Sequence, residues 1–170
     1  NKMKLYFSSA CIRSQDIFST IDIFKKNHFN NIELSAGTKY NEDFESKIIS
    51  FAFESNLDLC FHNYFPIPKK KFILNLASLN DNIYKKSINL CLNSIQLSKK
   101  LGIKIYSVHA GFFLDFGLNE IGKIIHEKKL YNKKKSIERF VRAWKILKEA
   151  SGSEVELYIE NNVLTKKNYE

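Results

Sequence analysis

The sequence predicts a parallel β/α barrel, and three observations carry that prediction. Short apolar runs rich in β-forming residues alternate with longer amphipathic stretches. The turns from a helix into the next strand are short, as in parallel β/α units. Ionisable residues stand at the carboxyl ends of successive strands, where such barrels carry their functional groups. With 170 residues, the chain is long enough for one domain with a substantial core.

The first half of the chain contains three predicted strands. A strand at 5–9 is followed by a helix over 14–27, whose apolar face includes Ile17, Ile21 and Phe24. The next strand, 31–35, reads NIELS, and a helix over 42–56 follows it. The third strand, 57–62, reads LDLCFH and leads into a long loop that contains both prolines of the chain, Pro66 and Pro68.

The second half repeats the alternation. A helix over 81–101 ends with Lys99 and Lys100, cations that suit the negative end of the helix dipole, and then Gly102, which can adopt a left-handed cap. The strand IKIYSVH follows at 103–109. A helix over 135–150, a second glycine (Gly152) and the strand VELYIE at 155–160 complete the pattern. The chain lacks both GxGxxG after the first strand and GxxxxGK[ST], which excludes the Rossmann and P-loop sites and leaves open a doubly wound sheet with another ligand.

Strand parity points to a site. Because side chains alternate faces along a strand, one face of each predicted strand is apolar and the other ends in an ionisable residue. His62, His109 and Glu160 occupy those ends, and Glu33 lies in the NIELS strand. Two imidazoles with one or two carboxylates suit zinc, manganese, iron or cobalt. A single strand-end histidine is more often structural, so the joint placement carries the prediction.

Composition excludes several classes of protein. Hydrophobic residues make up 44% and charged residues 26% of the chain, and no apolar run approaches the ~20 residues of a membrane span. No signal-peptide pattern is present, so we expect a cytoplasmic protein. The net charge of +9 comes in lysine runs that fit a general compositional bias as well as a nucleic-acid surface. Cys11, Cys60 and Cys91 lack metal-site spacing and are expected to be reduced and mostly buried, whereas His28 and His126 are expected at the surface.

At these residues the sequence resembles the xylose isomerase-like barrels, which include sugar isomerases and epimerases, inosose dehydratases and zinc apurinic endonucleases. NIELS, FHNYF, VHAGF and YIENN carry the resemblance. It implies that residues 1–170 form the N-terminal part of a single eight-stranded barrel. We therefore expect a fragment that is inactive alone. The other reading is a natural half-barrel, whose open edges would invite pairing with another chain and a homo-oligomer.

The resemblance implies two activities. In the endonuclease branch, the residues matching His62, His109 and Glu160 bind zinc. In the epimerase branch, the residue matching Glu160 is both metal ligand and acid/base group, and the histidines line the pocket.

We expect a divalent-metal-dependent sugar or sugar phosphate isomerase or epimerase that transfers a proton through an enediolate, with zinc, manganese, cobalt or magnesium. Glu160 and His109 would be catalytic and, with His62, would bind the metal. The residues expected to contact a sugar or polyol are Glu33, His62, Asn63, Tyr64 and Asn161. The alternatives are a zinc-dependent apurinic endonuclease, with nucleic acid as partner, and a non-catalytic barrel fragment.

Overall fold

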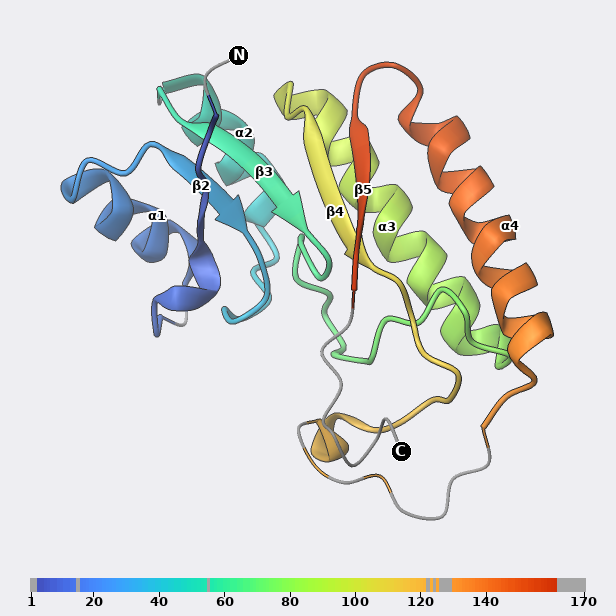
Figure 1. Ribbon diagram of the computed structural model, residues 1–170. Coiled ribbons are helices and arrows are strands. Elements are labelled where there is room, and N and C mark those ends of the chain that lie inside the picture. The colour runs from blue at the N-terminus through green and yellow to red at the C-terminus, as the bar shows by residue number, and fades with distance from the viewer. Residues whose placement is uncertain are drawn as a thin grey trace.

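A computed structural model describes residues 3–14, 16–54, 56–121, 123, 125 and 130–161 of the chain. Within these residues, β-strands alternate with α-helices along the whole length (Figure 1). The strands are β1 (Phe7–Ser8), β2 (Asn31–Leu34), β3 (Asp58–His62), β4 (Ile105–His109) and β5 (Glu156–Glu160). The α-helices are α1 (Ile17–Lys26), α2 (Phe44–Glu54), α3 (Asp81–Leu101) and α4 (Lys133–Ser151), and short 3-10 turns lie at Ser9–Cys11 and Leu118–Glu120.

The five strands form one sheet in the order β1-β2-β3-β4-β5, and every neighbouring pair is parallel. A doubly wound sheet would reverse its strand order at a switch point. Sequential order without reversal is the topology of a β/α barrel. The predicted fold class is confirmed as a partial barrel of five strands, and the doubly wound alternative is excluded.

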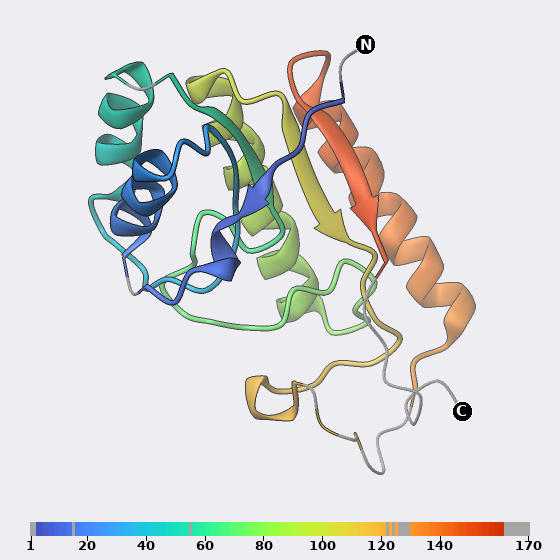
Figure 2. The same cartoon turned by 60° about the vertical axis from the view of Figure 1, so that its left-hand side comes forward.

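The helices lie outside the curved sheet, with α3 and α4 behind β4 and β5 (Figure 2). Helix α3 contacts both α2 and α4, so neighbouring helices form a continuous outer layer. The core lies between this layer and the sheet. Its fully buried side chains include Ile32 and Leu34 of β2, Phe61 of β3, and Tyr106 and Val108 of β4. These are the residues that strand parity places on the helix-bearing face.

Helix ends follow local chemistry. Asn80 and Asn132 begin α3 and α4, because their side-chain oxygens accept hydrogen bonds from the free backbone N–H groups of the first turn. Gly102 ends α3 in the left-handed conformation (φ 67°), as the sequence predicts. Gly152 also has a positive φ (57°), with an extended ψ. The Asn132 cap explains why α4 begins two residues before the predicted start.

The cysteines and histidines outside the strand ends differ in their exposure to solvent. Cys60 and Cys91 are buried as predicted, whereas Cys11 is exposed, and all three are free thiols. His28 is exposed, and His126 lies outside the described residues. None of the described helices combines the length and the apolar character that crossing a bilayer would require.

Candidate metal centre

The register of β3, β4 and β5 brings three strand ends together. His109 pairs with Glu160 across the β4–β5 ladder, and His62 pairs with Ser107 across β3–β4. All three strands are parallel, so their carboxyl ends meet at one edge of the sheet. A backbone hydrogen bond from Ala110 N to the carbonyl of Glu160 (2.9 Å) continues the β4–β5 contact past the last ladder pair.

His62, His109 and Glu160 each offer one ligand atom, and these atoms all lie within 4.8 Å of one another. Nδ1 of His62 lies 3.2 Å from Oε1 of Glu160, and the two imidazole rings meet edge to face with centroids 5.0 Å apart. The His62 side chain is 13% exposed, whereas that of Glu160 is 45% exposed. The cluster thus has a desolvated wall formed by β3 and an open side at β5.

Two further polar groups surround His62. Ser107 Oγ lies 2.9 Å from Nδ1 of His62, in hydrogen-bond distance. Oε2 of Glu33, on β2, lies 4.0 Å from the same nitrogen. The Ser107 contact is a hydrogen bond, whereas Glu33 lies beyond hydrogen-bond distance, and hydrogen-bonding neighbours of a ligating histidine orient its ring.

Asn63 anchors the turn that follows β3. It is 3% exposed and has a positive φ of 45°, a conformation that asparagine tolerates better than most residues. Its backbone N–H donates to the carbonyl of Ser107 (2.7 Å), and its own carbonyl accepts from the hydroxyl of Tyr106 (3.0 Å). Its side chain lies beside His109, with Nδ2 3.4 Å from Nδ1 of that ring. Asn63 therefore couples β3 to β4 behind the cluster.

A buried asparagine fixes the loop after His109. Asn75 is fully buried, and its Nδ2 donates to the carbonyls of Phe112 and Leu114 and to the carboxylate of Asp115. Its Oδ1 accepts from the backbone N–H groups of Ala77 and Phe112. All polar atoms of this amide are thus used to tie the β3–α3 connection to the β4–α4 connection.

Asp115 extends the same network. Its Oδ2 accepts hydrogen bonds from the hydroxyls of Ser78 (2.6 Å) and Tyr131. Burial and the hydrogen bond to this carboxylate together raise the pKa of Tyr131 above its ordinary value of 10.0, so the phenol remains a donor at neutral pH. The loop that carries His109 into α4 is held at both ends.

The β3 strand also carries a thiol close to the cluster. Burial first, and then the carboxylates of Glu33, Asp58 and Glu160, raise the pKa of Cys60 to about 12. Among the described residues, the group whose ligand atoms come within reach of one ion is His62, His109 and Glu160, and it does not include Cys60.

The cluster fits a divalent metal ion. Two imidazole nitrogens and a carboxylate oxygen are the donor set of zinc and related ions. Two donors about 2.1 Å from one tetrahedral ion lie about 3.4 Å apart, a spacing compatible with ligand atoms that all lie within 4.8 Å of one another.

The sequence-predicted site residues fall into two groups. His62, His109, Glu160 and Glu33 come together as predicted, and Asn63 lies beside them. Tyr64 points away from the cluster, because its hydroxyl accepts from the backbone N–H of Leu74 (2.6 Å). Asn161 is exposed next to Glu160. The assignment of Glu33, His62, Asn63, Tyr64 and Asn161 as substrate contacts stays a prediction, as do the metal-binding and catalytic roles of His62, His109 and Glu160.

Sequence reasoning missed Ser107, Asn75 and Asp115 as supporting residues. Parity does place Ser107 on the face of His109, two residues earlier, which is the one signal that could have found it. The contacts of Asn75 and Asp115 join loops about 40 residues apart and leave no local pattern.

Comparison with known proteins shows short sequence matches and a broad structural one. No established family profile matches the sequence. A probable endonuclease 4 of Thermotoga neapolitana is 33% identical over 60 residues, which cover 33% of this chain and 21% of that protein. A second probable endonuclease 4, from Thermotoga maritima, is 37% identical over 49 residues, covering 29% of this chain and 17% of that protein.

Solved structures match nearly the whole chain. A D-tagatose 3-epimerase-like protein has a TM-score of 0.68 and 14% identity, covering 96% of this chain and 55% of its own. D-psicose 3-epimerase with D-tagatose from Clostridium cellulolyticum H10 has a TM-score of 0.59 and 18% identity, covering 92% and 50%. A xylose isomerase domain protein from Planctomyces limnophilus has a TM-score of 0.55 and 9% identity, covering 88% and 51%. The chain spans about half the length of these proteins, and at such identities the match concerns the fold.

Proposed function

Because the chain has the fold of a xylose isomerase-like β/α barrel over about half of that barrel's length, we propose that the whole protein is a divalent-metal-dependent isomerase or epimerase of a sugar or sugar phosphate. The observation that carries the proposal is the convergence of His62, His109 and Glu160 at the carboxyl ends of three adjacent parallel strands. A cluster of this composition at this end of a barrel is suited to catalysis rather than to stability.

The three residues have distinct parts in the proposal. A bound divalent metal supplies Lewis-acid stabilisation of negative charge on neighbouring carbonyl and hydroxyl oxygens. Glu160, whose side chain is nearly half exposed on the open side of the cluster, both ligates and moves the proton of the carbon next to the carbonyl. His109 and the desolvated His62 complete the ligand set, and Glu33 orients His62 or accepts from substrate hydroxyls.

The structural relatives support a sugar substrate. Two of the solved structures that the chain resembles over more than 90% of its length are described as a 3-epimerase or as similar to one, and one of them is a complex with D-tagatose. Inversion at the carbon beside a ketose carbonyl requires removal of a proton from one face of that carbon and delivery of a proton to the opposite face. Glu160 beside a Lewis acid would serve one face, and a second acid/base group of the whole protein would serve the other.

An exchange experiment tests the proposal. The full-length protein is incubated in D₂O with Mn²⁺ or Co²⁺ and a panel of ketoses and ketose phosphates. We expect epimerisation with deuterium incorporated at the inverted carbon, and loss of at least about 10²-fold in rate for Glu160→Gln. Glu149→Gln, which changes an exposed carboxylate on α4 in the same way, is the control. Metal bound at the cluster with no turnover of any substrate in the panel would refute the proposal.

A second candidate function is a zinc-dependent apurinic endonuclease. The matches to two probable endonuclease 4 proteins and the net charge of +9 favour it. Its test is cleavage of a duplex that contains one abasic site, with His109→Ala as the inactive variant and the exposed His28→Ala as control. Cleavage that depends on His109 would place the protein in this class, whereas cleavage equal in both variants would exclude the class.

A further inference from the structure

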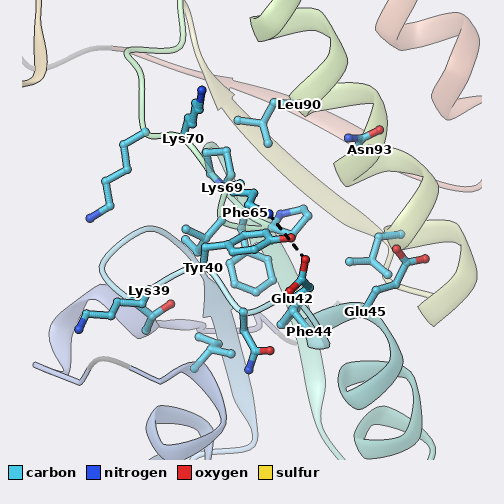
Figure 3. A pocket seen from close by; sticks show the side chains of 18 of the residues that line it. Lys39, Tyr40, Glu42, Phe44, Glu45, Phe65, Lys69, Lys70, Leu90 and Asn93 are labelled. Atoms are coloured by element: carbon cyan, nitrogen blue, oxygen red, sulfur yellow. Dashed lines mark ion pairs between the residues drawn. The ribbon is translucent and has the colours of Figure 1, made fainter.

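A cavity separate from the strand-end cluster opens on the outer side of the barrel. It has a volume of about 750 Å³ and lies between the β2–α2 loop, the β3–α3 loop and the side of α3 that carries Lys86 and Lys100 (Figure 3). None of His62, His109 and Glu160 lines it. Its volume falls within the range of about 300–1,000 Å³ that is typical of small-ligand sites.

The cavity is strongly basic. Its lining includes six lysines and two glutamates, namely Lys39, Lys69, Lys70, Lys71, Lys86, Lys100, Glu42 and Glu45. Lys69 pairs with Glu42 (3.6 Å), and Lys100 pairs with Glu45. The other four lysines have no carboxylate partner within the part of the chain that the structure describes, so the cavity carries a surplus of positive charge on two loops and a helix.

An unsatisfied hydroxyl lies in the same lining. Thr38 is 3% exposed, and its Oγ1 has no hydrogen-bond partner among the described residues. The other two buried hydroxyls without a partner there, Ser98 and Ser136, are on helices and do not line the cavity. A buried hydroxyl without a partner is costly. A ligand with hydrogen-bonding oxygens would satisfy Thr38.

Apolar rings complete the cavity. Phe65 is buried and Tyr40 is 41% exposed, and Figure 3 shows both in the middle of the lining, with the side chains of Lys39 and Lys70 farther out. Lys69 Nζ lies 5.8 Å from the centre of the Tyr40 ring. Ammonium groups around aromatic and apolar walls provide charge for an anion and a surface for a ring at the same time.

We propose that this cavity binds a small phosphorylated molecule that also carries a ring, a sugar phosphate or a nucleotide. The phosphate lies among Lys39, Lys70, Lys71 and Lys86, and the ring lies against the half-exposed Tyr40. A nucleic acid would need an extended track of cations along its backbone, whereas these lysines surround one concavity. The site is independent of the activity proposed for the strand-end cluster.

Calorimetric titration of the full-length protein tests the site. The probes are ribose 5-phosphate, AMP and pyrophosphate, each in low salt with EDTA, so that no metal-bound site contributes. We expect saturable binding of ribose 5-phosphate or AMP that is tighter than that of pyrophosphate and weakens as salt is added. Tighter binding of ribose 5-phosphate would identify the ligand as a sugar phosphate, and tighter binding of AMP would identify it as a nucleotide.

Variants locate the binding. In Lys70→Gln/Lys71→Gln the dissociation constant should rise at least about tenfold, whereas Lys145→Gln, an exposed lysine of α4, should leave it unchanged. Thr38→Val should weaken binding about threefold or more without lowering the melting temperature, because the hydroxyl has no partner in the described part of the unliganded protein. Absence of binding by all three probes, or binding unaffected by the Lys70/Lys71 and Thr38 variants, would overturn the proposal. A duplex oligonucleotide that binds through Lys70 and Lys71 and is not displaced by AMP would also overturn it.

Discussion

His62 Nδ1 lies 3.2 Å from Glu160 Oε1 although their strands, β3 and β5, are not neighbours in the sheet. Strand β4 runs between them, and two strand spacings amount to about 9.6 Å. The two side chains can meet because the sheet is curved, which brings the side chains on its inner face closer together. Ser107 of β4, which lies between them beside His62, is also small and leaves room for this contact. The site is therefore a product of the sheet's curvature and of the residue at its centre.

Ser107 should support metal binding through His62. Its Oγ is 2.9 Å from Nδ1 of that ring, and removal of such a partner of a ligating histidine typically weakens metal binding about 10-fold or more. We predict such a loss of Co²⁺ affinity in Ser107→Ala, measured by titration. Ser46→Ala, on the exposed face of α2, should bind Co²⁺ as the unaltered protein does, and equal affinities in the two variants would contradict the role of Ser107.

Asn75→Ala should destabilise the fold. The substitution removes five hydrogen bonds of a fully buried amide and leaves the backbone groups of Ala77, Phe112 and Leu114 without that partner. We expect a loss of about 3–5 kcal/mol in the free energy of unfolding, measured in urea. Asn89→Ala, an exposed asparagine of the same chain on α3, should cost nothing measurable. A loss below about 1 kcal/mol for Asn75→Ala would show that water replaces the network.

Alanine substitutions at two glycines with positive φ should distinguish the cost of backbone strain from the cost of a steric clash. At Gly102 (φ 67°) an added Cβ would meet no atom within 4 Å, so Gly102→Ala should cost only about 1 kcal/mol of conformational strain. At Gly111 (φ 94°) the Cβ would lie 2.9 Å from Oδ1 of the buried Asn75 and 3.2 Å from Ala77. Gly111→Ala should therefore cost more, about 2–4 kcal/mol. Urea unfolding of both variants tests this, and equal losses would contradict the close approach of the two loops.

The buried thiol of Cys91 should make the fold sensitive to alkali. Burial raises its pKa from the usual 9.0 to about 12. Below pH 9 the thiol is neutral in both folded and unfolded chains, and stability from this group is fully present. Between about pH 9 and 12 the unfolded chain ionises and the folded chain does not, so stability falls as pH rises. The free energy of unfolding should decline more steeply above pH 9 for the unaltered protein than for Cys91→Ala, and parallel curves would contradict the raised pKa.

The elements with strong local signals could be predicted closely from the sequence. Helix α3 has the bounds expected from its amphipathic pattern and its Lys99-Lys100-Leu101-Gly102 ending. Strand β1 is shorter than predicted, at Phe7–Ser8, because the chain turns into a 3-10 helix at Ser9. Ile159 lies on the face that parity assigns to helices, yet it is 46% exposed.

The alternation of side chains along a strand was enough to predict which residues form the site. A period of two identifies which face of a strand His62, His109 and Glu160 occupy, and parallel order brings their ends to one edge. It does not determine register, so the pairing of His62 with Ser107 could be found only in three dimensions. The outer cavity escaped sequence analysis for a related reason, since its lysines come from two loops and a helix.

Cobalt binding measures directly whether the strand-end cluster is a metal centre. Co²⁺ is titrated into the full-length protein, and its visible absorption reports ligand type and geometry. We predict one site whose spectrum is altered and whose affinity falls at least about tenfold in each of His62→Ala, His109→Ala and Glu160→Gln, with His28→Ala unchanged. Binding of Co²⁺ with the same spectrum and affinity in all four variants would show that the strand-end cluster is not a metal centre.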